Sequence, residues 1–205
     1  MTVTNGYATL AEFKLYDTSR GGTVTTDTND DTVIEDLIEL ASRYIDGDTG
    51  RRFWKVTNDE TRYYTPMDDD ECEVDDLSAA PTSVSVDYGG LRSYTALSTT
   101  DDYELDPPNA ALDGKPYTCL SILPTSTAYF PLSTRAVKVV AKFGWPSVPD
   151  DIKSLCLAIT LNCYKSRSGQ SSAGDVSVTA SGIVIRPRDV PEWGRQIIAK
   201  YRKYL

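Results

Sequence analysis

Both ends of the chain show the residue spacing of helices, and the central stretch between them shows the pattern of short strands. Apolar residues recur at steps of three and four from Val33 to Ile45 and again from Ile152 to Cys163, which is the spacing of a buried helix face. Between Thr61 and Phe143, β-like runs alternate with Pro, Gly and Asp. The pattern predicts an α+β protein. We expect a small helical bundle of two N-terminal and two C-terminal helices, an inserted antiparallel β domain, and a short β-hairpin before the last helix.

These changes in residue pattern divide the chain into three predicted segments. Residues 1–56 are expected to form an N-terminal helical part, and residues 57–146 a β insertion folded as a small antiparallel sheet or barrel. Residues 147–205 are expected to form a C-terminal helical part with the hairpin, packing on residues 1–56. A chain of 205 residues with 40% apolar content can bury such a core without disulfides or metals.

The first two helices carry start signals. Thr9 and Glu12 have the spacing of a capping box at the start of a short helix. A longer helix follows, for which Asp30 or Asp31 can act as the cap, and its pattern ends at Gly47. The apolar residues that the short helix is expected to bury are Leu10, Phe13 and Leu15.

The central segment contains six candidate strands separated by turn residues. Their spacing fits a small antiparallel sheet or barrel. The candidate strands are Arg62–Thr65, Glu71–Val74, Ser83–Val86, Tyr103–Leu105, Cys119–Leu123 and Ala136–Phe143.

Helical spacing returns at Pro149, which is expected in the first turn of a central helix that is apolar most of the way round. A Ser/Gly-rich loop from Ser166 to Gly174 follows, and we expect it to order on assembly. Val176–Ala180 and Ile183–Arg186 are predicted to form the hairpin. Pro191 opens the last helix, whose predicted apolar face carries Trp193, Ile197, Ile198, Tyr201 and Leu205.

The charge distribution favours protein partners over nucleic acid. A net charge of −9 and a pI near 4.5 argue against a dedicated nucleic-acid binder, which needs clustered Lys and Arg. Residues 61–113 hold 13 acidic and 2 basic side chains, whereas residues 151–205 hold 4 acidic and 9 basic. These opposed charges are typical either of two solvated surfaces or of a subunit that packs against its own copies or a partner.

The composition excludes most catalytic chemistry. The chain has no histidine, so it contains neither a Ser-His-Asp triad nor a Cys-His pair, and we expect no enzyme, metal or cofactor. A hydrolase that uses only carboxylates is not formally excluded. The run Asp68–Glu71 lacks the ligand spacing of a calcium loop and is interpreted as an exposed hairpin tip.

The four cysteines lack the spacing of a zinc site. Cys156 and Cys163 are expected to be buried small apolar residues, and a bond between Cys72 and Cys119 is possible but not favoured. No secretory leader is evident, and no apolar stretch approaches the roughly 20 residues of a membrane span, so a soluble protein is expected.

Five segments resemble the head–tail connector (adaptor) proteins of tailed bacteriophages. The match depends on their order and spacing, and none of them is a catalytic signature. The segments are Tyr7–Lys14, Ala41–Asp46, Thr49-Gly50-Arg51-Arg52-Phe53, Thr61–Tyr64 and Phe143–Lys153.

The resemblance implies a ring subunit, typically one of twelve, that binds its own copies, the portal protein and a tail-side connector or stopper protein. It implies a place in the virion neck, with assembly in the host cytoplasm, and a channel through which DNA passes without sequence-specific binding. The β insertion departs from the minimal family pattern, and its acidic residues 61–113 are a candidate wall of that channel.

Two sets of residues are therefore candidates for function. The family-motif residues Thr49, Gly50, Arg51, Arg52 and Phe53 are expected to be structural, with both arginines near the end of the long helix. The candidate subunit or portal interface comprises Arg186, Arg188, Trp193, Arg195, Arg202 and Lys203.

An alternative function is a carbohydrate- or receptor-binding β module with helical flanks, because Trp54, Trp145 and the 13 tyrosines offer stacking faces.

Overall fold

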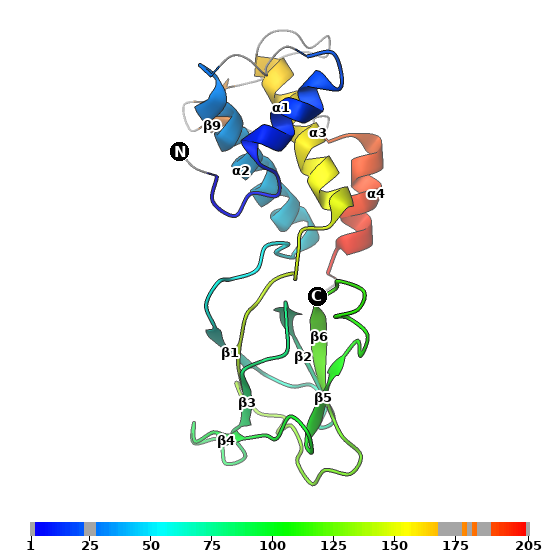
Figure 1. Ribbon diagram of the computed structural model, residues 1–205. Coiled ribbons are helices and arrows are strands. Elements are labelled where there is room, and N and C mark those ends of the chain that lie inside the picture. Colours follow the sequence, from blue (N-terminus) through cyan, green and yellow to red (C-terminus); the bar gives the residue numbers. More distant parts are fainter. Residues whose placement is uncertain (1–2, 23–27, 168–177, 180–181, 184–189, 204–205) are drawn as a thin grey trace. The chain divides into compact units, whose positions relative to one another are not determined.

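The computed structural model describes residues 3–22, 28–167, 178–179, 182–183 and 190–203. The chain forms two compact units, one of residues 1–51 together with 148–205 and the other of residues 52–147. Helices dominate the first unit, which we call the helical unit, and antiparallel strands dominate the second, which we call the β unit (Figure 1). The predicted α+β fold, with helices at both ends, a β insertion and a hairpin before the last helix, is confirmed.

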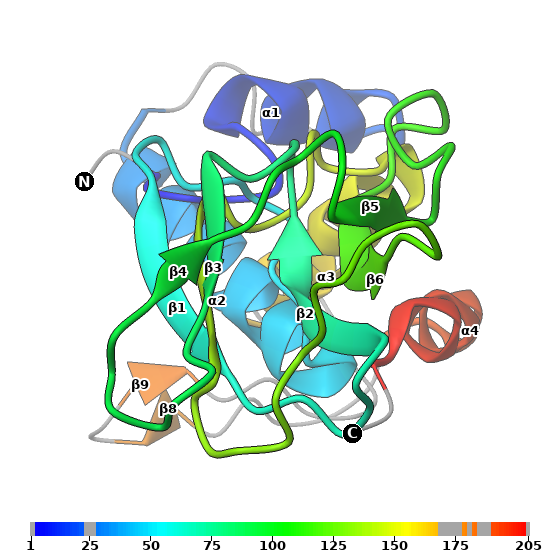
Figure 2. The same cartoon turned by 90° about the horizontal axis from the view of Figure 1, so that it is seen from below.

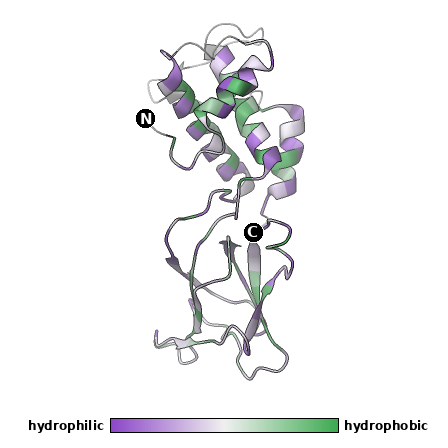
Figure 3. Ribbon diagram, in the orientation of Figure 1, coloured by the Kyte–Doolittle hydropathy of each residue, from purple (hydrophilic) through white to green (hydrophobic). Residues whose placement is uncertain are grey.

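Four helices and one hairpin make up the described part of the first unit. The helices are α1 (Leu10–Thr18), α2 (Asp31–Thr49), α3 (Asp150–Arg167) and α4 (Glu192–Tyr201), and the hairpin pairs β8 (Val178–Thr179) with β9 (Gly182–Ile183). Helices α2 and α3 lie side by side (Figure 1). Apolar and hydrophilic residues alternate along α2 and α4, as expected of helices that bury one face (Figure 3). None of the described helices is long and apolar enough to cross a membrane.

The predicted capping box of α1 is confirmed. The Glu12 backbone N–H donates to Thr9 Oγ1 at 3.2 Å, and the Thr9 backbone N–H donates to Glu12 Oε2 at 2.8 Å. The predicted burial of Leu15 is wrong, because its side chain is 71% exposed. Leu15 lies two residues from the buried Phe13, roughly 200° away around a helix, so the two cannot share a face.

Helix α2 begins and ends differently from the prediction. Asp30 occupies the N-cap position but makes no capping bond with its side chain, which accepts a hydrogen bond from the Tyr164 hydroxyl at 2.8 Å. Asp31 instead pairs with Lys14. The helix continues past Gly47 to Thr49, and it ends because Gly50 adopts a left-handed conformation with φ +66°.

Helix α3 is the central helix of its unit. It begins at Asp150, and the Pro149 carbonyl just before it accepts the first helical hydrogen bond, from Lys153 N–H at 2.9 Å. Ile152 and Ile159 on one face are fully buried, and Leu157 and Leu161 on other faces are only 7% and 5% exposed. The prediction of a helix covered on several sides is confirmed.

Seven strands form two antiparallel sheets in the second unit (Figure 2). One sheet has the order β1-β7-β3-β4 and the other the order β2-β6-β5, so the strands are divided between two sheets where the sequence predicted a small antiparallel sheet or barrel. Strand β4 had no counterpart in the prediction. The bounds are β1 Glu60–Tyr64, β2 Glu71–Leu77, β3 Ser83–Val86, β4 Thr95–Ala96, β5 Tyr103–Asp106, β6 Tyr117–Ile122 and β7 Val137–Ala141.

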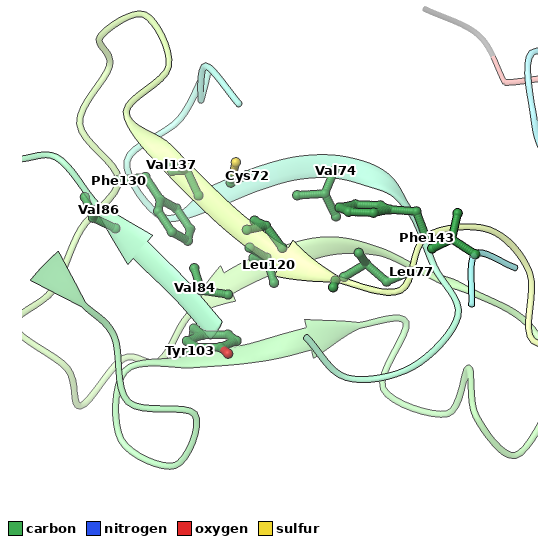
Figure 4. Packing of buried hydrophobic residues seen from close by; sticks show 13 residues of the cluster. Cys72, Val74, Leu77, Val84, Val86, Tyr103, Leu120, Phe130, Val137 and Phe143 are labelled. Carbon is green, nitrogen blue, oxygen red and sulfur yellow. The ribbon is translucent and has the colours of Figure 1, made fainter. Parts of the chain in front are cut away.

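The two sheets share one apolar core (Figure 4). Leu120 of β6, Val84 of β3 and Val137 of β7 are completely buried in it. Burial of each such side chain stabilises the fold by about 1.5–3 kcal/mol. The labelled members of this cluster are Cys72, Val74, Leu77, Val84, Val86, Tyr103, Leu120, Phe130, Val137 and Phe143.

Candidate functional site

The segments that carry the family resemblance contact one another in the fold. The first two meet where the Tyr7 backbone N–H donates to Ser42 Oγ at 3.0 Å and the Tyr7 hydroxyl donates to Asp46. Arg43 adds a bond from its guanidinium to the Asn5 carbonyl at 3.0 Å. Tyr7 and Ser42 are buried, so these residues hold the chain before α1 against α2.

The last resemblance segment contributes a fixed turn to the β unit. Gly144 has φ +104°, and a Cβ at this position would lie 1.9 Å from the Trp54 carbonyl oxygen. Only glycine fits such a site. The turn brings Trp145 to 5.2 Å from the Phe53 ring, and the Arg62 guanidinium lies 3.9 Å from the centre of the Phe143 ring.

Thr49, Gly50 and Arg51 meet the end of the described C-terminal segment. The Lys203 backbone N–H donates to the Thr49 carbonyl at 2.8 Å, and Arg51 Nε donates to the Tyr201 carbonyl at 2.8 Å. Arg202 Nε donates to the Asp48 carbonyl at 3.0 Å. We call this set of contacts the C-terminal clamp. It satisfies carbonyl groups at the end of α2, which have no partner within the helix itself.

The candidate interface residues are distributed over several places. Arg186 and Arg188 lie outside the described residues, as do residues 168–174 of the Ser/Gly-rich loop. Trp193 was predicted on the apolar face of α4, but its side chain is 43% exposed. Arg195 is exposed as well and pairs with Glu192 at 3.4 Å. Arg202 and Lys203 belong to the C-terminal clamp, where Arg202 remains exposed.

The other two motif residues belong to the β unit. The Arg52 guanidinium lies 5.6 Å from the centre of the Trp54 ring, and the Phe53 side chain is completely buried. The structure therefore brings Arg202 and Lys203 together with Thr49, Gly50 and Arg51 within one unit.

Ion pairs that the sequence did not predict join the helices. Asp151 accepts a hydrogen bond from Lys200 Nζ at 2.9 Å and another from the Tyr201 hydroxyl, and this joins α3 to α4. Burial raises the pKa of Asp151, but the bonds from Lys200 and Tyr201 outweigh burial, so the net pKa is lowered. From the sequence, Asp150 and Asp151 were expected only to interact with the dipole at the start of the helix. No local pattern indicated that Asp151 would pair with a residue 49 positions away.

A matching ion pair joins α1 to α3. Lys153 Nζ donates to Glu12 Oε1 at 2.8 Å. Burial raises the pKa of Glu12, but the hydrogen bonds from Lys153 and Thr9 outweigh it, and the net pKa is lowered. Both ion pairs therefore serve to position helices.

Three of the four cysteines have the properties of buried structural residues, and Cys119 is half-buried. Cys72, Cys119, Cys156 and Cys163 form no disulfide within the described part of the chain, and Cys156 and Cys163 are buried as predicted. Burial raises the pKa of Cys72 to about 12 and that of Cys156 to about 11. Thiols with such values are not nucleophilic at neutral pH.

The acidic run before β2 is exposed as predicted, but it is not a hairpin tip, because β1 and β2 belong to different sheets. Asp68, Asp69 and Asp70 lie close enough together to offer carboxylate oxygens to one cation. Exposed carboxylates on a turn are common without a bound ion, and the Asp70 backbone N–H already donates to Asp68 Oδ1 at 3.0 Å. We therefore assign no metal site to this turn.

Three loops at one end of the β unit are joined to one another. Arg92 of the β3–β4 loop donates to the Thr134 carbonyl of the β6–β7 loop at 2.7 Å, and the Arg135 backbone N–H donates to Thr65 Oγ1 of the β1–β2 loop at 3.0 Å. The Tyr88 and Tyr129 rings contact each other at 5.0 Å. These loops also carry strongly exposed apolar side chains, namely Met67, Leu91 and Leu132.

Comparison with known proteins finds similar solved structures but no matching protein family and no matching curated sequence. No family model matches the chain, and no curated protein matches it. One similar structure is a chain of the neck of an empty GTA (gene transfer agent) particle computed with C6 symmetry, with 17% identity and a TM-score of 0.55. Another is a chain of the neck of a native GTA particle computed with C12 symmetry, with 14% identity and a TM-score of 0.55.

Both likenesses extend over the whole length of the molecules. They cover 100% of this chain, and 94% and 93% of the two neck chains. The helical ends, the β insertion and the late hairpin are therefore all included in the comparison. The chain has the fold of chains found in the necks of phage-like GTA particles.

Proposed function

We propose that the protein is a structural head–tail connector subunit that forms a ring in the neck of a tailed phage or phage-like particle. Its ring lies between the portal and the tail, provides a passage for DNA and offers a platform for tail attachment. The observation that carries this proposal is the likeness in fold, over the full length of the chain, to chains of GTA particle necks.

The chemistry of the described residues supports a structural role. The buried cysteines have raised pKa values, and the helix-joining carboxylates are engaged in ion pairs. With no histidine in the sequence, no described group is placed as a nucleophile beside a base. This arrangement supports a function in protein–protein contact.

The proposed ring has twelve copies. The resemblance to phage connectors implies this number, and the native GTA neck was computed with C12 symmetry. A ring subunit needs surfaces for its neighbours, for the portal and for a tail-side connector or stopper. We propose that Arg186, Arg188, Trp193 and Arg195 belong to the subunit or portal surfaces, together with the exposed guanidinium of Arg202 and with Lys203.

Imaging of the protein mixed with its portal tests the proposal. We expect closed rings stacked on portal rings in negative-stain images, and a twelve-fold mass in native mass spectrometry. Persistent monomers that never associate with portal would contradict the proposal. Monomers that instead bind glycans on an array would favour the carbohydrate-binding alternative.

A charge-reversal pair tests the basic surface. We expect Arg186→Glu combined with Arg188→Glu to reduce ring assembly on the portal at least tenfold, because like charges would then face each other across the interface. The control combines Arg20→Glu with Lys115→Glu, which changes the net charge equally at exposed positions outside the basic C-terminal part. Equal assembly by both double variants would remove these arginines from the interface.

A further inference from the structure

Strand β5 is an edge strand of its sheet. It is the last strand of the sheet β2-β6-β5, and among the described strands it pairs only with β6. The Leu123 backbone N–H donates to the Asp102 carbonyl at 2.9 Å, so residue 102 faces β6. Because backbone groups alternate in an antiparallel ladder, the N–H and C=O groups of Tyr103 and Leu105 face away from β6. A free edge of this kind is a template for another strand.

A pocket lies beside this free edge. It has a volume of about 480 Å³. Tyr103 and Leu105, whose backbone groups face away from β6, both line it. Residues before β3, before β5 and after β5 line it as well. The remaining lining residues are Ala80, Pro81, Thr99, Thr100, Glu104, Pro108, Tyr117 and Leu123.

The Tyr103 side chain supplies a second, independent sign of a ligand. It is only 3% exposed, and among the described residues its hydroxyl has no hydrogen-bond partner. Figure 4 shows its ring at the margin of the core cluster, beside Val84. Burial raises the pKa of Tyr103 to about 12, so the hydroxyl stays protonated as a donor. A buried donor without an acceptor is costly, and a bound carbonyl would relieve that cost.

The charge around the edge indicates what it binds. Residues 101–106 include four acidic side chains and no basic one. The hydrogen bonds from the Ser98 backbone and the Ser126 hydroxyl lower the pKa of Asp102, which keeps that carboxylate charged. An extended segment that binds here is therefore expected to be basic, with an apolar side chain that packs against lining residues such as Leu105 and Leu123.

We infer that the free edge of β5 and its pocket bind an extended segment of a second copy of this chain, the stretch Gly182–Arg188. This stretch reads Gly-Ile-Val-Ile-Arg-Pro-Arg, so it combines three β-branched residues with two arginines. Strand β9 begins within it, at Gly182 and Ile183. The inference rests on the proposed ring, because strand addition between copies would join neighbouring subunits.

Fluorescence anisotropy with a labelled synthetic peptide of sequence Gly182–Arg188 tests the inference. The receptor is the full-length chain carrying Arg186→Glu and Arg188→Glu, so that its own stretch competes less. We expect saturable binding, and at least tenfold weaker binding of a peptide whose two arginines are replaced by glutamate. Equal binding of both peptides, or no saturable binding, would overturn the inference.

Two receptor variants test the pocket itself. Ala80→Trp, at an exposed lining position, fills the pocket and is expected to weaken peptide binding at least tenfold. Met67→Trp adds the same side chain at a position that is 97% exposed and outside the pocket, and should leave binding unchanged. Equal binding by both variants would show that the peptide binds elsewhere.

Tyr103→Phe separates ligand recognition from folding. Removal of a hydroxyl without a partner should leave the urea midpoint unchanged or raise it, while peptide affinity falls about three- to tenfold through the lost hydrogen bond. Unchanged peptide affinity would contradict a donor role for Tyr103. Rings that form on portal without any peptide binding would overturn this inference alone, whereas failure of rings to form would overturn the proposed function.

Discussion

Two glycines at the end of α2 show how single residues decide where an element stops. Gly47 lies within the helix, and an added Cβ would meet nothing within 4 Å. Gly50 follows the helix in a left-handed conformation that other residues adopt only at a cost. The sequence shows both glycines but not their dihedral angles, which is why the predicted helix ended at Gly47.

Alanine substitutions at these glycines should have opposite effects on stability. Gly47→Ala is expected to raise the free energy of unfolding by about 0.5–1 kcal/mol, because alanine loses less backbone entropy in a helix. Gly50→Ala should lower it by about 1–2 kcal/mol, because its φ of +66° is strained for an L-residue. Urea unfolding monitored by circular dichroism measures both, and the same sign for both variants would contradict the assignment.

A buried bond between side chains fixes Trp145 in the β unit. Trp145 Nε1 donates to Asp76 Oδ2 at 3.0 Å, and both residues are buried. Asp76→Ala removes the acceptor and is expected to cost about 1–3 kcal/mol of unfolding free energy. Asp76→Asn keeps an acceptor oxygen and should cost less. Equal losses for the two variants in urea unfolding would show that the bond itself is not what matters.

At the scale of elements, two ion pairs and the C-terminal clamp join the helices of the first unit. Lys153 links α3 to Glu12 of α1, and Lys200 links α4 to Asp151 of α3. The exposed character of these pairs limits what each contributes at neutral pH. Their effect should be clearest as the carboxylates titrate.

Acid should weaken the helical unit through Glu12 and Asp151. Their pKa values are lowered from 4.5 and 3.8 in the folded state, so their contribution is present above those values and is lost as the pH falls through the lowered ones. We expect Glu12→Gln and Asp151→Asn to reduce the loss of stability between neutral pH and about pH 3. Gln can still serve in the capping box.

Unfolding free energies measured in urea across this pH range test that expectation. The exposed Glu71→Gln is the control, since this side chain forms no ion pair with any described residue. It should reproduce the pH dependence of the unmodified chain. If Glu12→Gln and Asp151→Asn show the same dependence of unfolding free energy on pH as Glu71→Gln, the two ion pairs are excluded as the source of acid sensitivity.

At the scale of the whole molecule, the β unit has a core of its own. Its buried cluster draws on both sheets, and all of its members lie within residues 52–147. We therefore propose that this segment is an independently folding domain. Such a domain can be inserted into a helical host because its core does not depend on the host residues.

A fragment of residues 52–147 tests this proposal. We expect dispersed amide signals in its NMR spectrum and a single cooperative unfolding transition in urea. Val84→Ala, which truncates a completely buried side chain, should lower its stability by about 0.5–3 kcal/mol through lost apolar burial. A fragment without dispersed signals would show that residues outside 52–147 are needed for folding.

The sequence by itself determined the elements, because their signals are local. Helical periodicity located α2 and α3, the Thr9–Glu12 capping box located α1, and alternation with turn residues located six of the seven strands of the β unit. The two-residue strand β4 was missed, since it is too short to show any period. The absence of histidine likewise restricts the chemistry that the chain can perform, whatever its fold.

Only the tertiary structure decided the partners, because partners lie far apart in the chain. Pairing of β1 with β7 joins Glu60 to Ala141, and a strand-like run does not specify which strand it will join. Arg51 reaches the carbonyl of Tyr201, and among the described residues the hydroxyl of Tyr103 is left without a partner at a free sheet edge. Contacts of this kind form only when the packed chain brings distant groups together. Local sequence patterns do not specify which distant groups will meet.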